Sequence, residues 1–385
     1  MTGGGSAGHI TPILSVATEL KKIQPKAEIC YVGQRGDSLS SLTTAKGSPI
    51  DASRAIFAGK WRRYHGVGFW AHIKDWRTLL KNIRDLVYLA IGFLQSMALL
   101  IRWRPQVVFI KGGFVGMPVG LAAALLRVPI VTHDSDALPG LTNRVLSRFA
   151  TKQCVGLPVE YYKQYGPEKM VHTGVPTNPA YAPLSEKQKN ELKMQLQLPK
   201  DALVLTIFGG SLGAIRLNNA VLEVVPTLLE RLPKLHVLHV TGATQNEEIA
   251  TAYNELPKSL ASRVWTWPFL PNLHEITGVA DVVISRAGAT SIAELGLQKR
   301  ATIIVPNPYL VGGHQTHNAR LIEDKDAAIV VTEKELDHNM TAFQAIIDSL
   351  LHDERRQQQL GKNLQALCIP EAAHAIATIL IKVAA

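Results

Sequence analysis

The chain has 385 residues, of which 46% are hydrophobic and 19% charged, a composition typical of a folded protein rather than a disordered one. Its length suits two domains of about 150–200 residues each. The three cysteines, Cys30, Cys154 and Cys368, lie far apart without a CxxC pair. A disulfide framework or a zinc site is therefore not expected, and a reducing cytosol fits the chain. The first residues lack the basic and apolar stretches of a signal peptide.

The net charge of +10 is concentrated in one segment. Residues 52–104 hold ten Lys or Arg residues but only two acidic ones, Asp75 and Asp85, and they contain four of the six tryptophans. Such a segment favours an anionic partner: a membrane surface, a phosphate-bearing substrate or a nucleic acid. No recognised nucleic-acid-binding module accompanies these charges, so we expect no nucleic acid partner.

Short β-branched runs alternate with longer helical patterns along the whole chain. Each run ends near Gly, Ser, His or Asp, where a helical pattern begins, and this is the βαβ rhythm of doubly wound parallel sheets. The runs predicted as buried strands are residues 27–33, 106–113, 129–134, 202–210, 235–242, 281–288 and 302–306.

The alternation predicts an α/β fold in two halves, joined by a charged, proline-marked stretch near residues 176–201. In a doubly wound domain a strand should lead into the first glycine loop, yet that loop begins here at the third residue. The first strand is therefore expected to be missing. A recorded start downstream of the true one explains this better than the loss of a central strand, which would expose apolar surface.

Three glycine-rich loops are candidate phosphate sites. Gly3, Gly5 and Gly8 fit GxGxxG, and residues 111–118 and 208–214 each follow a predicted strand and precede a helix. Backbone N–H groups at a helix start bind anionic oxygen, and glycine leaves them unobstructed. One such loop is equally compatible with a plain turn, but three favour a pyrophosphate donor together with a pyrophosphate acceptor. A nicotinamide dehydrogenase would not account for all of them.

Six segments in the same order resemble the motifs of the MurG-type glycosyltransferases of family 28: residues 3–12, 111–118, 139–144, 209–214, 285–296 and 314–319. The resemblance implies the GT-B fold, in which two doubly wound Rossmann-like domains face a central cleft. It implies an acceptor- and membrane-binding domain at 1–178 and a UDP-sugar domain at 179–361. A carboxy-terminal helix within 362–385 is expected to pack back on the first domain.

The resemblance implies that the second domain binds UDP-N-acetylglucosamine. Glu294 would accept hydrogen bonds from both ribose hydroxyls, the Leu270 backbone would contact uracil, and Arg286 would add positive charge. The alternatives are an exposed helix carboxylate for Glu294 and local ion pairing for Arg286. The residues implied for donor binding are Ser6, Asn178, Gly210, Ser211, Leu212, Gly213, Leu270, Arg286, Ala289, Thr290, Ser291, Glu294, His314, Gln315 and Asn318. His314 and His317 lack a third ligand in view, so no metal is expected.

The acceptor site implied for the first domain consists of Gly5, Ser6, Ala7, Gly8, His9, Gly112, Gly113 and Phe114. The acceptor hydroxyl must lose a proton as it attacks the anomeric carbon, and His9 is the first candidate for the general base. Alternatively, His9 only donates to the acceptor pyrophosphate or caps the helix. Asp136 is the second candidate base.

Two positions depart from the family pattern. Asp136 stands where the family carries an asparagine that contacts the donor sugar, and Asn178 stands where it normally carries an arginine. An ionised aspartate accepts hydrogen bonds but cannot donate them. The identity of the transferred sugar therefore stays open.

Helical spacing in residues 73–84 predicts an amphipathic helix with a cationic flank. Its apolar arc includes Trp76 and Leu80, and the predicted membrane-binding residues are Lys74, Trp76, Arg77, Leu80, Lys81 and Arg84. The alternative is a core-packed helix with a solvated basic side. The following run, residues 86–101, is short for a membrane span and is predicted to pack on the sheet.

The resemblance implies an inverting transferase that converts lipid I to lipid II in peptidoglycan synthesis, bound peripherally at the cytoplasmic side of the bacterial inner membrane. No obligatory cofactor is implied, because loop amides and a helix dipole would stabilise the UDP leaving group. The alternatives are another GT-B glycolipid hexosyltransferase, a UDP-sugar epimerase, and a non-catalytic sugar-nucleotide-binding membrane subunit. The oligomeric state is open.

Overall fold

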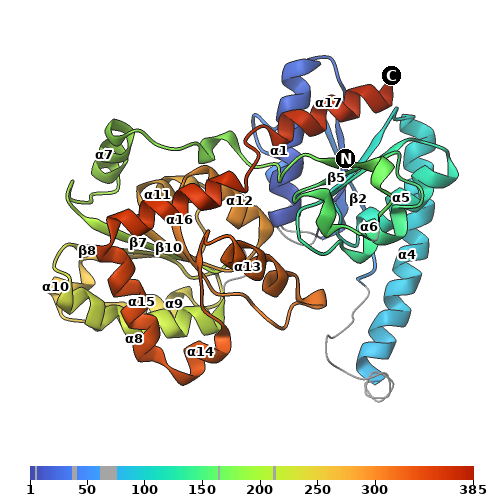
Figure 1. Cartoon of the computed structure of the whole chain (residues 1–385). Helices are drawn as coiled ribbons and strands as arrows, with labels where there is room; N and C mark the ends of the chain where they lie inside the picture. The colour runs from blue at the N-terminus through green and yellow to red at the C-terminus, as the bar shows by residue number, and fades with distance from the viewer. Residues whose placement is uncertain (5–6, 37–40, 61–75, 164, 211–213) are drawn as a thin grey trace. The chain divides into compact units, whose positions relative to one another are not determined.

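The computed structural model describes the chain except for residues 5–6, 37–40, 61–75, 164 and 211–213. It divides into two compact units, each with its own parallel sheet (Figure 1). The first unit consists of Met1–Asn178, Tyr309–His314 and Ile369–Ala385, and the second of Pro179–Pro308 and Gln315–Cys368. The chain therefore passes between the units more than once.

The first unit contains a strand pair and a four-stranded sheet, all parallel. The pair is β1 (Cys30–Gln34) with β2 (Ala52–Ile56), and the sheet has the order β3 (Val108–Ile110), β4 (Ile130–Asp134), β5 (Lys152–Val155), β6 (Met170–His172). Every residue of β3 and β4 is buried, as expected for parallel strands covered on both faces. The helices are α1 (Ala7–Ile23), α2 (Ser41–Thr44), α4 (Trp76–Trp103), α5 (Gly116–Leu125), α6 (Leu141–Leu146) and α17 (Ala372–Ala384), with short 3-10 turns η2 (Val159–Tyr161) and η3 (Pro167–Lys169).

Thr2 lies between β1 and β3 and links them. It forms isolated parallel bridges with Val32 and with Ile110, and its N–H donates to the Phe109 carbonyl at 2.8 Å. The amino-terminal ammonium of Met1 donates to the Cys30 carbonyl at 2.7 Å. The place of the strand that should precede the first glycine loop is thus held by these two residues.

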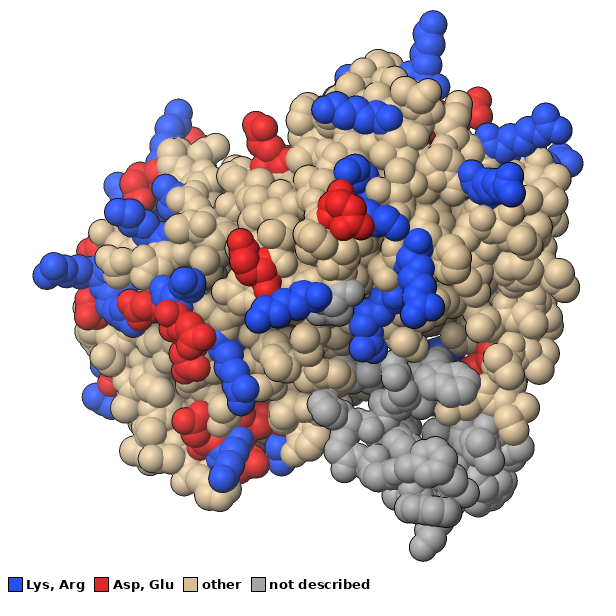
Figure 2. Space-filling view, turned by 45° about the vertical axis from the view of Figure 1, so that its right-hand side comes forward, with Lys and Arg blue, Asp and Glu red and all other residues tan. Residues whose placement is uncertain are grey.

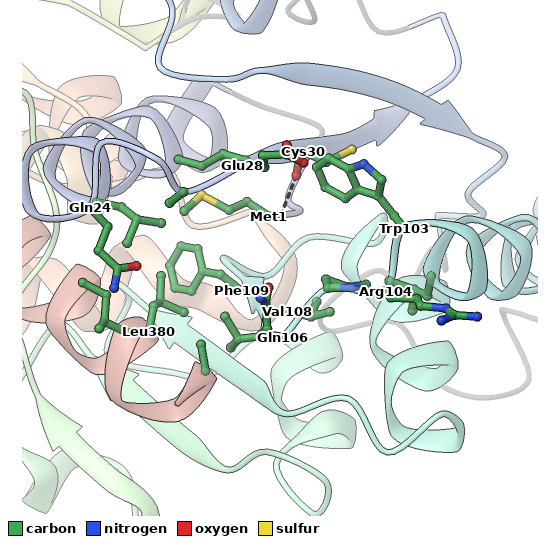
Figure 3. A pocket seen from close by; sticks show the side chains of 18 of the residues that line it. Met1, Gln24, Glu28, Cys30, Trp103, Arg104, Gln106, Val108, Phe109 and Leu380 are labelled. Atoms are coloured by element: carbon green, nitrogen blue, oxygen red, sulfur yellow. Dashed lines mark hydrogen bonds between the residues drawn. The ribbon is translucent and has the colours of Figure 1, made fainter.

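A pocket of about 990 Å³ opens beside Met1, between the amino-terminal ends of β1 and β3 (Figure 3). Its lining includes the segments leading into both strands, Glu28–Ile29 and Gln106–Val107. Apolar side chains from the surrounding helices complete it, among them Trp103 of α4 and Leu380 of α17. The pocket therefore lies between the two strands, beside Met1.

The carboxy-terminal helix α17 packs against α1 in the first unit. Its buried residues Ala373, Ile376 and Leu380 share one apolar cluster with Ile10 and Ile13 of α1. The helix begins at Ala372, and the residues from 362 to Cys368 belong to the second unit. The expected boundary at 361/362 therefore differs from the structure, because α16 (Glu354–Ala366) continues across it.

The second unit has a six-stranded parallel sheet of order β12-β11-β10-β7-β8-β9. Its strands are β7 (Leu203–Phe208), β8 (Leu235–Val240), β9 (Val264–Trp267), β10 (Val282–Ser285), β11 (Ala301–Ile304) and β12 (Ile329–Val330). Its helices are α7 (Glu186–Gln195), α8 (Ile215–Arg231), α9 (Asn246–Asn254), α10 (Lys258–Ala261), α11 (Leu273–Val279), α12 (Ala289–Leu297), α13 (His314–Asp324), α14 (Glu333–His338), α15 (Met340–His352) and α16, with the turn η4 (Pro179–Tyr181). The turn η5 (Val311–Gly313) and His314, the first residue of α13, belong to the first unit.

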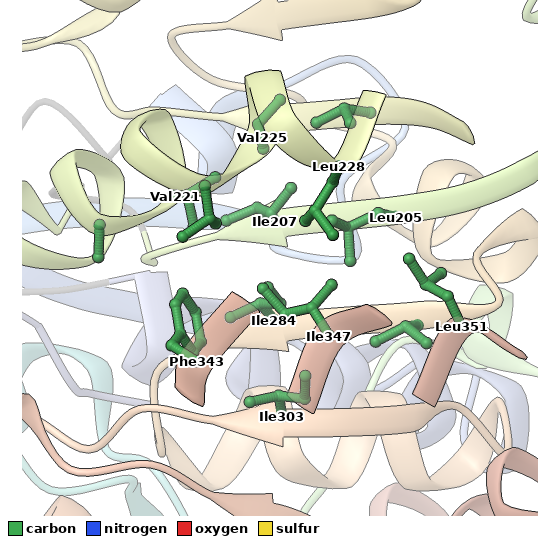
Figure 4. Close-up of a cluster of buried hydrophobic side chains, with 14 of the residues drawn as sticks. Leu205, Ile207, Val221, Val225, Leu228, Ile284, Ile303, Phe343, Ile347 and Leu351 are labelled. Atoms are coloured by element: carbon green, nitrogen blue, oxygen red, sulfur yellow. The ribbon is translucent and has the colours of Figure 1, made fainter. Parts of the chain in front are cut away.

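One apolar cluster holds this sheet to its helices (Figure 4). Val221 and Leu228 of α8 pack with Ile207 of β7, while Phe343 and Ile347 of α15 join the same cluster. Each of these side chains is buried, so the carboxyl ends of the central strands are held in fixed positions.

Candidate active site

The glycine loops of the first unit lie against each other. Gly112 and Gly113 follow β3 with φ angles of 97° and 75°, a left-handed conformation that glycine adopts without strain. A Cβ atom on Gly113 would lie 2.6 Å from the Gly4 carbonyl oxygen, so the second loop closely approaches the first. The structure thus brings together the predicted segments around Gly4 and Gly112–Phe114. Gly5 and Ser6 lie outside the described residues.

The start of α1 carries three predicted acceptor residues, Ala7, Gly8 and His9. The charges of Lys111 and Asp136 both act on the His9 ring. Burial, helped by the positive charge of Lys111, lowers the pKa of His9 to about 4, while Asp136 acts in the opposite direction. His9 is therefore a neutral imidazole at neutral pH, the form that can accept a proton.

Lys111 is a charged residue of this site that was not predicted from the sequence. It is only 4% exposed and occupies the position directly after β3, at the head of the second glycine loop. Burial lowers the pKa of Lys111, and the carboxylates of Asp136 and Asp134 oppose that effect. The signal in the sequence was a lysine at the end of a buried strand, next to Gly112.

The end of β4 anchors the segment that carries Asp136. Asp134 accepts hydrogen bonds from the Tyr165 hydroxyl at 2.8 Å and the Gly140 N–H at 3.2 Å. The Tyr162 hydroxyl donates to the Asp136 carbonyl at 3.0 Å. These bonds fix the backbone at Asp136, whose side chain is half-buried, in the same unit as His9.

Two helix starts in the second unit lie at neighbouring strands. The glycine loop after β7 contains Gly210, with φ of 91°, and leads to α8; Ser211, Leu212 and Gly213 lie outside the described residues. The segment after β10 leads to α12, whose first turn holds the predicted residues Ala289, Thr290 and Ser291. β7 pairs with β10 on one side and with β8 on the other, so the direction in which successive strands are added to the sheet reverses at β7. Such a reversal is the usual ligand position in a doubly wound sheet.

The N-cap residue of α12 is Gly288, so no side chain caps the first turn. An uncapped turn leaves backbone N–H groups directed along the helix axis, where the helix dipole favours an anion. Glu294 lies further along α12, and its carboxyl hydrogen-bonds the Tyr181 hydroxyl. Burial raises the pKa of Glu294 to about 8, so this carboxyl is not the exposed helix carboxylate of the alternative interpretation.

Arg286 serves a local role. Its guanidinium lies 2.7 Å from the Glu333 carboxylate and donates to the Val305 carbonyl at 3.1 Å. Both charged side chains are buried. These contacts agree with the local-pairing alternative for Arg286, whose counter-charge is Glu333.

The remaining predicted donor residues are spread over both units. Gln315 accepts a hydrogen bond from the Asn307 N–H at 2.8 Å, and Asn318 donates to the Ala287 carbonyl at 3.0 Å, which ties α13 to the segment after β10. His314 hydrogen-bonds the Leu138 carbonyl at 3.1 Å within the first unit. Leu270 lies partly buried between β9 and α11, and Asn178 is the last residue before the second unit.

Within the described part of the chain, no group of three His, Cys, Asp or Glu side chains is placed to hold a metal ion.

The predicted membrane helix is longer than expected. Residues 73–84 and 86–101 were predicted as separate elements, but one helix, α4, runs from Trp76 to Trp103. Lys74 lies outside the described residues, and the side chains of Trp76, Arg77 and Leu80 are not described. Lys81 and Arg84 are exposed.

One face of the run at 86–101 packs on the core that contains the strands, as predicted, but the run does not bury all its apolar side chains. Phe93, Met97 and Leu100 pack with the apolar core of the first unit. A second set of large apolar side chains is exposed along α4, namely Ile83, Leu86, Val87, Ile91, Leu94 and Ile101, which we call the α4 stripe. Among the described residues, Lys81–Trp103 is long and apolar enough to cross a bilayer, by length and composition alone.

Charge is unevenly distributed over the surface. On the face shown in Figure 2, Lys and Arg predominate on the right, whereas both signs mix on the left.

The fold of each unit, with helix starts at the carboxyl ends of its strands, is that of the GT-B class. Solved structures with this fold include that of Acinetobacter baumannii MurG, with TM-score 0.70 and 23% identity over 99% of this chain and 98% of that one. The structure of S. aureus MnaA with UDP gives TM-score 0.66 and 12% identity over 98% of this chain and 94% of that one.

The sequence comparisons define the family. Residues 1–155 match the glycosyltransferase family 28 N-terminal domain, and residues 204–376 match the glycosyltransferase family 28 C-terminal domain. A UDP-N-acetylglucosamine--N-acetylmuramyl-(pentapeptide) pyrophosphoryl-undecaprenol N-acetylglucosamine transferase of Listeria monocytogenes serotype 4b is 32% identical, over 97% of this chain and 96% of its own. One from Bacillus cereus is 31% identical over 99% and 98%. The chain belongs to the MurG-type transferases of glycosyltransferase family 28.

Proposed function

We propose that the chain transfers N-acetylglucosamine from UDP-N-acetylglucosamine to the muramyl 4-hydroxyl of the lipid-linked peptidoglycan precursor, converting lipid I to lipid II. The observation that carries this proposal is the near-complete match to curated relatives named for that reaction, at 31–32% identity. The displacement inverts the anomeric carbon, from an α-linked donor to a β-linked product.

The donor occupies the second unit at the crevice between β7 and β10. The uncapped first turn of α12 and the start of α8 lie beside the diphosphate, where backbone N–H groups and two helix dipoles balance its charge. The Glu294 carboxyl accepts from the ribose hydroxyls, and the Leu270 backbone contacts uracil. Gln315 faces the sugar. Arg286 is left out of this set, because Glu333 already balances its charge.

The acceptor occupies the first unit at the paired glycine loops. The close approach of Gly113 to Gly4 supports a shared pyrophosphate site built from both loops. His9 removes the proton from the acceptor hydroxyl, since its ring is neutral at neutral pH and can take up a proton. Asp136 is the alternative base. If His9 is the base, the Asp136 carboxylate accepts a hydrogen bond from a sugar hydroxyl.

No metal or organic cofactor takes part in the proposed reaction. Amides at the helix starts stabilise the charge that develops on the leaving UDP, so a divalent cation is not needed there. The substrates are therefore the UDP-sugar and the polyprenyl-linked acceptor alone.

The chain binds peripherally to an anionic membrane at its cytoplasmic side, where a polyprenyl-linked acceptor would be held. The cationic residues at the start of α4 attract anionic headgroups, and the α4 stripe supplies apolar area for the lipid boundary. The exposure of Leu86 and Leu94, at 56% and 67%, supports this role.

The test is UDP release from UDP-N-acetylglucosamine, with and without a muramyl-pyrophosphoryl-polyprenol acceptor, with UDP-glucose and UDP-galactose as parallel donors. Acceptor-dependent release from the N-acetylglucosamine donor alone is expected. Release from another donor would indicate a different glycolipid hexosyltransferase, with Asp136 as the first residue to exchange. Interconversion of free UDP-sugars without acceptor would indicate an epimerase, and no turnover with retained UDP binding would indicate a binding subunit.

A further inference from the structure

Tyr181 is a buried aromatic residue at the start of the second unit. It closes the short turn η4, three residues after Asn178, where the chain leaves the first unit. The side chain is 8% exposed, and its ring packs edge-on against His274 with centroids 5.8 Å apart. Both the ring and the turn are therefore fixed against the body of the second unit.

The hydroxyl of Tyr181 hydrogen-bonds the carboxyl of Glu294 on α12, and η4 contacts this helix. Two effects act on this carboxyl: burial raises its pKa to about 8, and the Tyr181 bond acts in the opposite direction. The tyrosine thus stabilises the ionised form of a carboxyl that its surroundings disfavour.

A carboxylate has two oxygens with about four lone-pair directions. One bond from Tyr181 occupies one direction, so the remainder can accept from the two hydroxyls of a ribose. A side chain held by one hydrogen bond also loses less rotamer freedom when the ligand binds.

We propose that Tyr181 is a positioning residue of the donor site, which orients the Glu294 carboxyl for the ribose diol and so sets the preference for a ribonucleotide over a 2′-deoxyribonucleotide. This inference rests on the proposed assignment of Glu294 to the ribose. It also makes the segment that joins the two units part of nucleotide recognition.

The pH dependence follows from the same contact. With its pKa at about 8, the Glu294 carboxyl is largely protonated in the free chain at neutral pH. Ribose hydroxyls that donate to it favour the ionised form, so binding releases a proton. The affinity for the diol therefore rises with pH up to about 8 and levels off above it.

The experiment measures binding of UDP and of 2′-deoxyuridine diphosphate by calorimetry between pH 6 and 9. The ratio of the two affinities isolates the ribose 2′-hydroxyl, because both ligands carry the same titrating diphosphate. The variant is Tyr181→Phe. The matched control is Tyr253→Phe, which removes another buried hydroxyl of the second unit, 3.3 Å from the His239 ring.

In the unmodified protein UDP binds more tightly than the deoxy ligand, and their affinity ratio increases towards pH 8. Tyr181→Phe lowers the affinity ratio by about 5-fold, as expected for the loss of one hydrogen bond to a charged group. In this variant the ratio increases only at a higher pH. Tyr253→Phe leaves the ratio unchanged.

An equal loss of affinity for both ligands in Tyr181→Phe would assign the tyrosine a purely structural role and overturn the inference. A pH-independent ratio in the unmodified protein would overturn the proposed coupling between ribose binding and the ionisation of Glu294, without any variant. Failure of the unmodified protein to bind UDP at all would instead refute the proposed function.

Discussion

The guanidinium of Arg286 lies 2.7 Å from the carboxylate of Glu333, and the two side chains are only 8% and 3% exposed. Arg216, at the start of α8, contacts the same carboxylate at 3.0 Å. Glu333 therefore joins the segment that leads into α12 to the helix that follows the glycine loop. The starts of α8 and α12, which belong to the proposed donor site, are therefore both linked to the buried carboxylate of Glu333.

Replacing Glu333 with alanine is expected to lower the free energy of unfolding by about 3–5 kcal/mol, because it leaves a buried guanidinium without its partner. Asp337→Ala is the matched control. Its carboxylate lies 3.2 Å from Arg216, but both partners are about half exposed, so a loss below about 1 kcal/mol is expected. Urea titration measures both values, and equal losses would contradict the structural role of the pair.

Buried histidines make the folded protein sensitive to acid. Burial lowers the pKa of His9 to about 4 and that of His239 to about 3, whereas an unfolded histidine titrates near 6.5. Below pH 6.5 the unfolded chain takes up protons that the folded chain does not, so stability falls as the pH drops from about 6.5 to 4. Each such group contributes up to about 1.4 kcal/mol per pH unit.

Urea midpoints at pH 7 and pH 5 measure this dependence. His239→Gln is expected to flatten the pH dependence even if it also lowers stability at pH 7. The control is His338→Gln at an exposed position. A pH dependence that stays the same in both variants would argue against His239 as a source.

The two candidate bases can be separated by turnover. His9→Ala is expected to reduce kcat by about 10²–10⁴, the usual range for a general base, with little change in UDP affinity. Since the pKa of His9 is lowered to about 4, the acid limb of the kcat/KM profile should lie well below pH 6.5. Asp136→Asn serves as the comparison. A larger loss in Asp136→Asn than in His9→Ala would transfer the base to Asp136.

Membrane attachment should depend on the cationic residues between positions 74 and 84. Replacing Lys74, Arg77, Lys81 and Arg84 by Gln is expected to weaken binding to anionic vesicles by at least about 100-fold at low salt, at roughly 1 kcal/mol per cation. Leu94→Ser should weaken the vesicle binding that remains at high salt. The control replaces four exposed lysines of the second unit: Lys187, Lys200, Lys258 and Lys325. Equal losses in the control would point to net charge alone.

The pocket beside Met1 predicts an effect of added residues. About five apolar residues placed before Met1 would extend between the ends of β1 and β3, and would turn the buried ammonium into an amide. The melting temperature should rise by at least about 4 °C. A Ser- and Asp-rich extension of equal length also removes the ammonium, so it isolates the gain from apolar burial. No difference between the two would show that the pocket takes no strand.

Seven strands were predictable because buried parallel strands read as continuous apolar runs. The strands β2, β5, β6, β9 and β12 were not among the predicted runs. Residues 202–210 and 281–288 contain β7 and β10, the strands that lead to the two helix starts. The order of these strands in the sheet came from the structure. The division of α4 into two elements was wrong for a local reason. The division fell at Asp85, a charged residue that is buried with its carboxylate 3.0 Å from the Arg84 guanidinium, so the helix continues through it.

The contacts of the candidate site that join distant segments of the chain could not be predicted from the sequence. Nothing near Arg286 in the sequence identifies Glu333 as its partner, and nothing near Tyr181 points to Glu294. Lys111 carried a readable signal, since a lysine at the end of a buried strand must find compensation for its burial. Side-chain pairing across a sheet is set by topology rather than by local pattern.

The packing of α17 on α1 has a consequence for how the chain folds as it is made. Ile10 and Ile13 leave the ribosome long before Ile376 and Leu380, which complete their cluster. The second unit has all its residues by Cys368. It can therefore finish folding while the first unit still exposes an apolar face. Ending the chain after α16 should leave UDP binding in place and expose that face to aggregation.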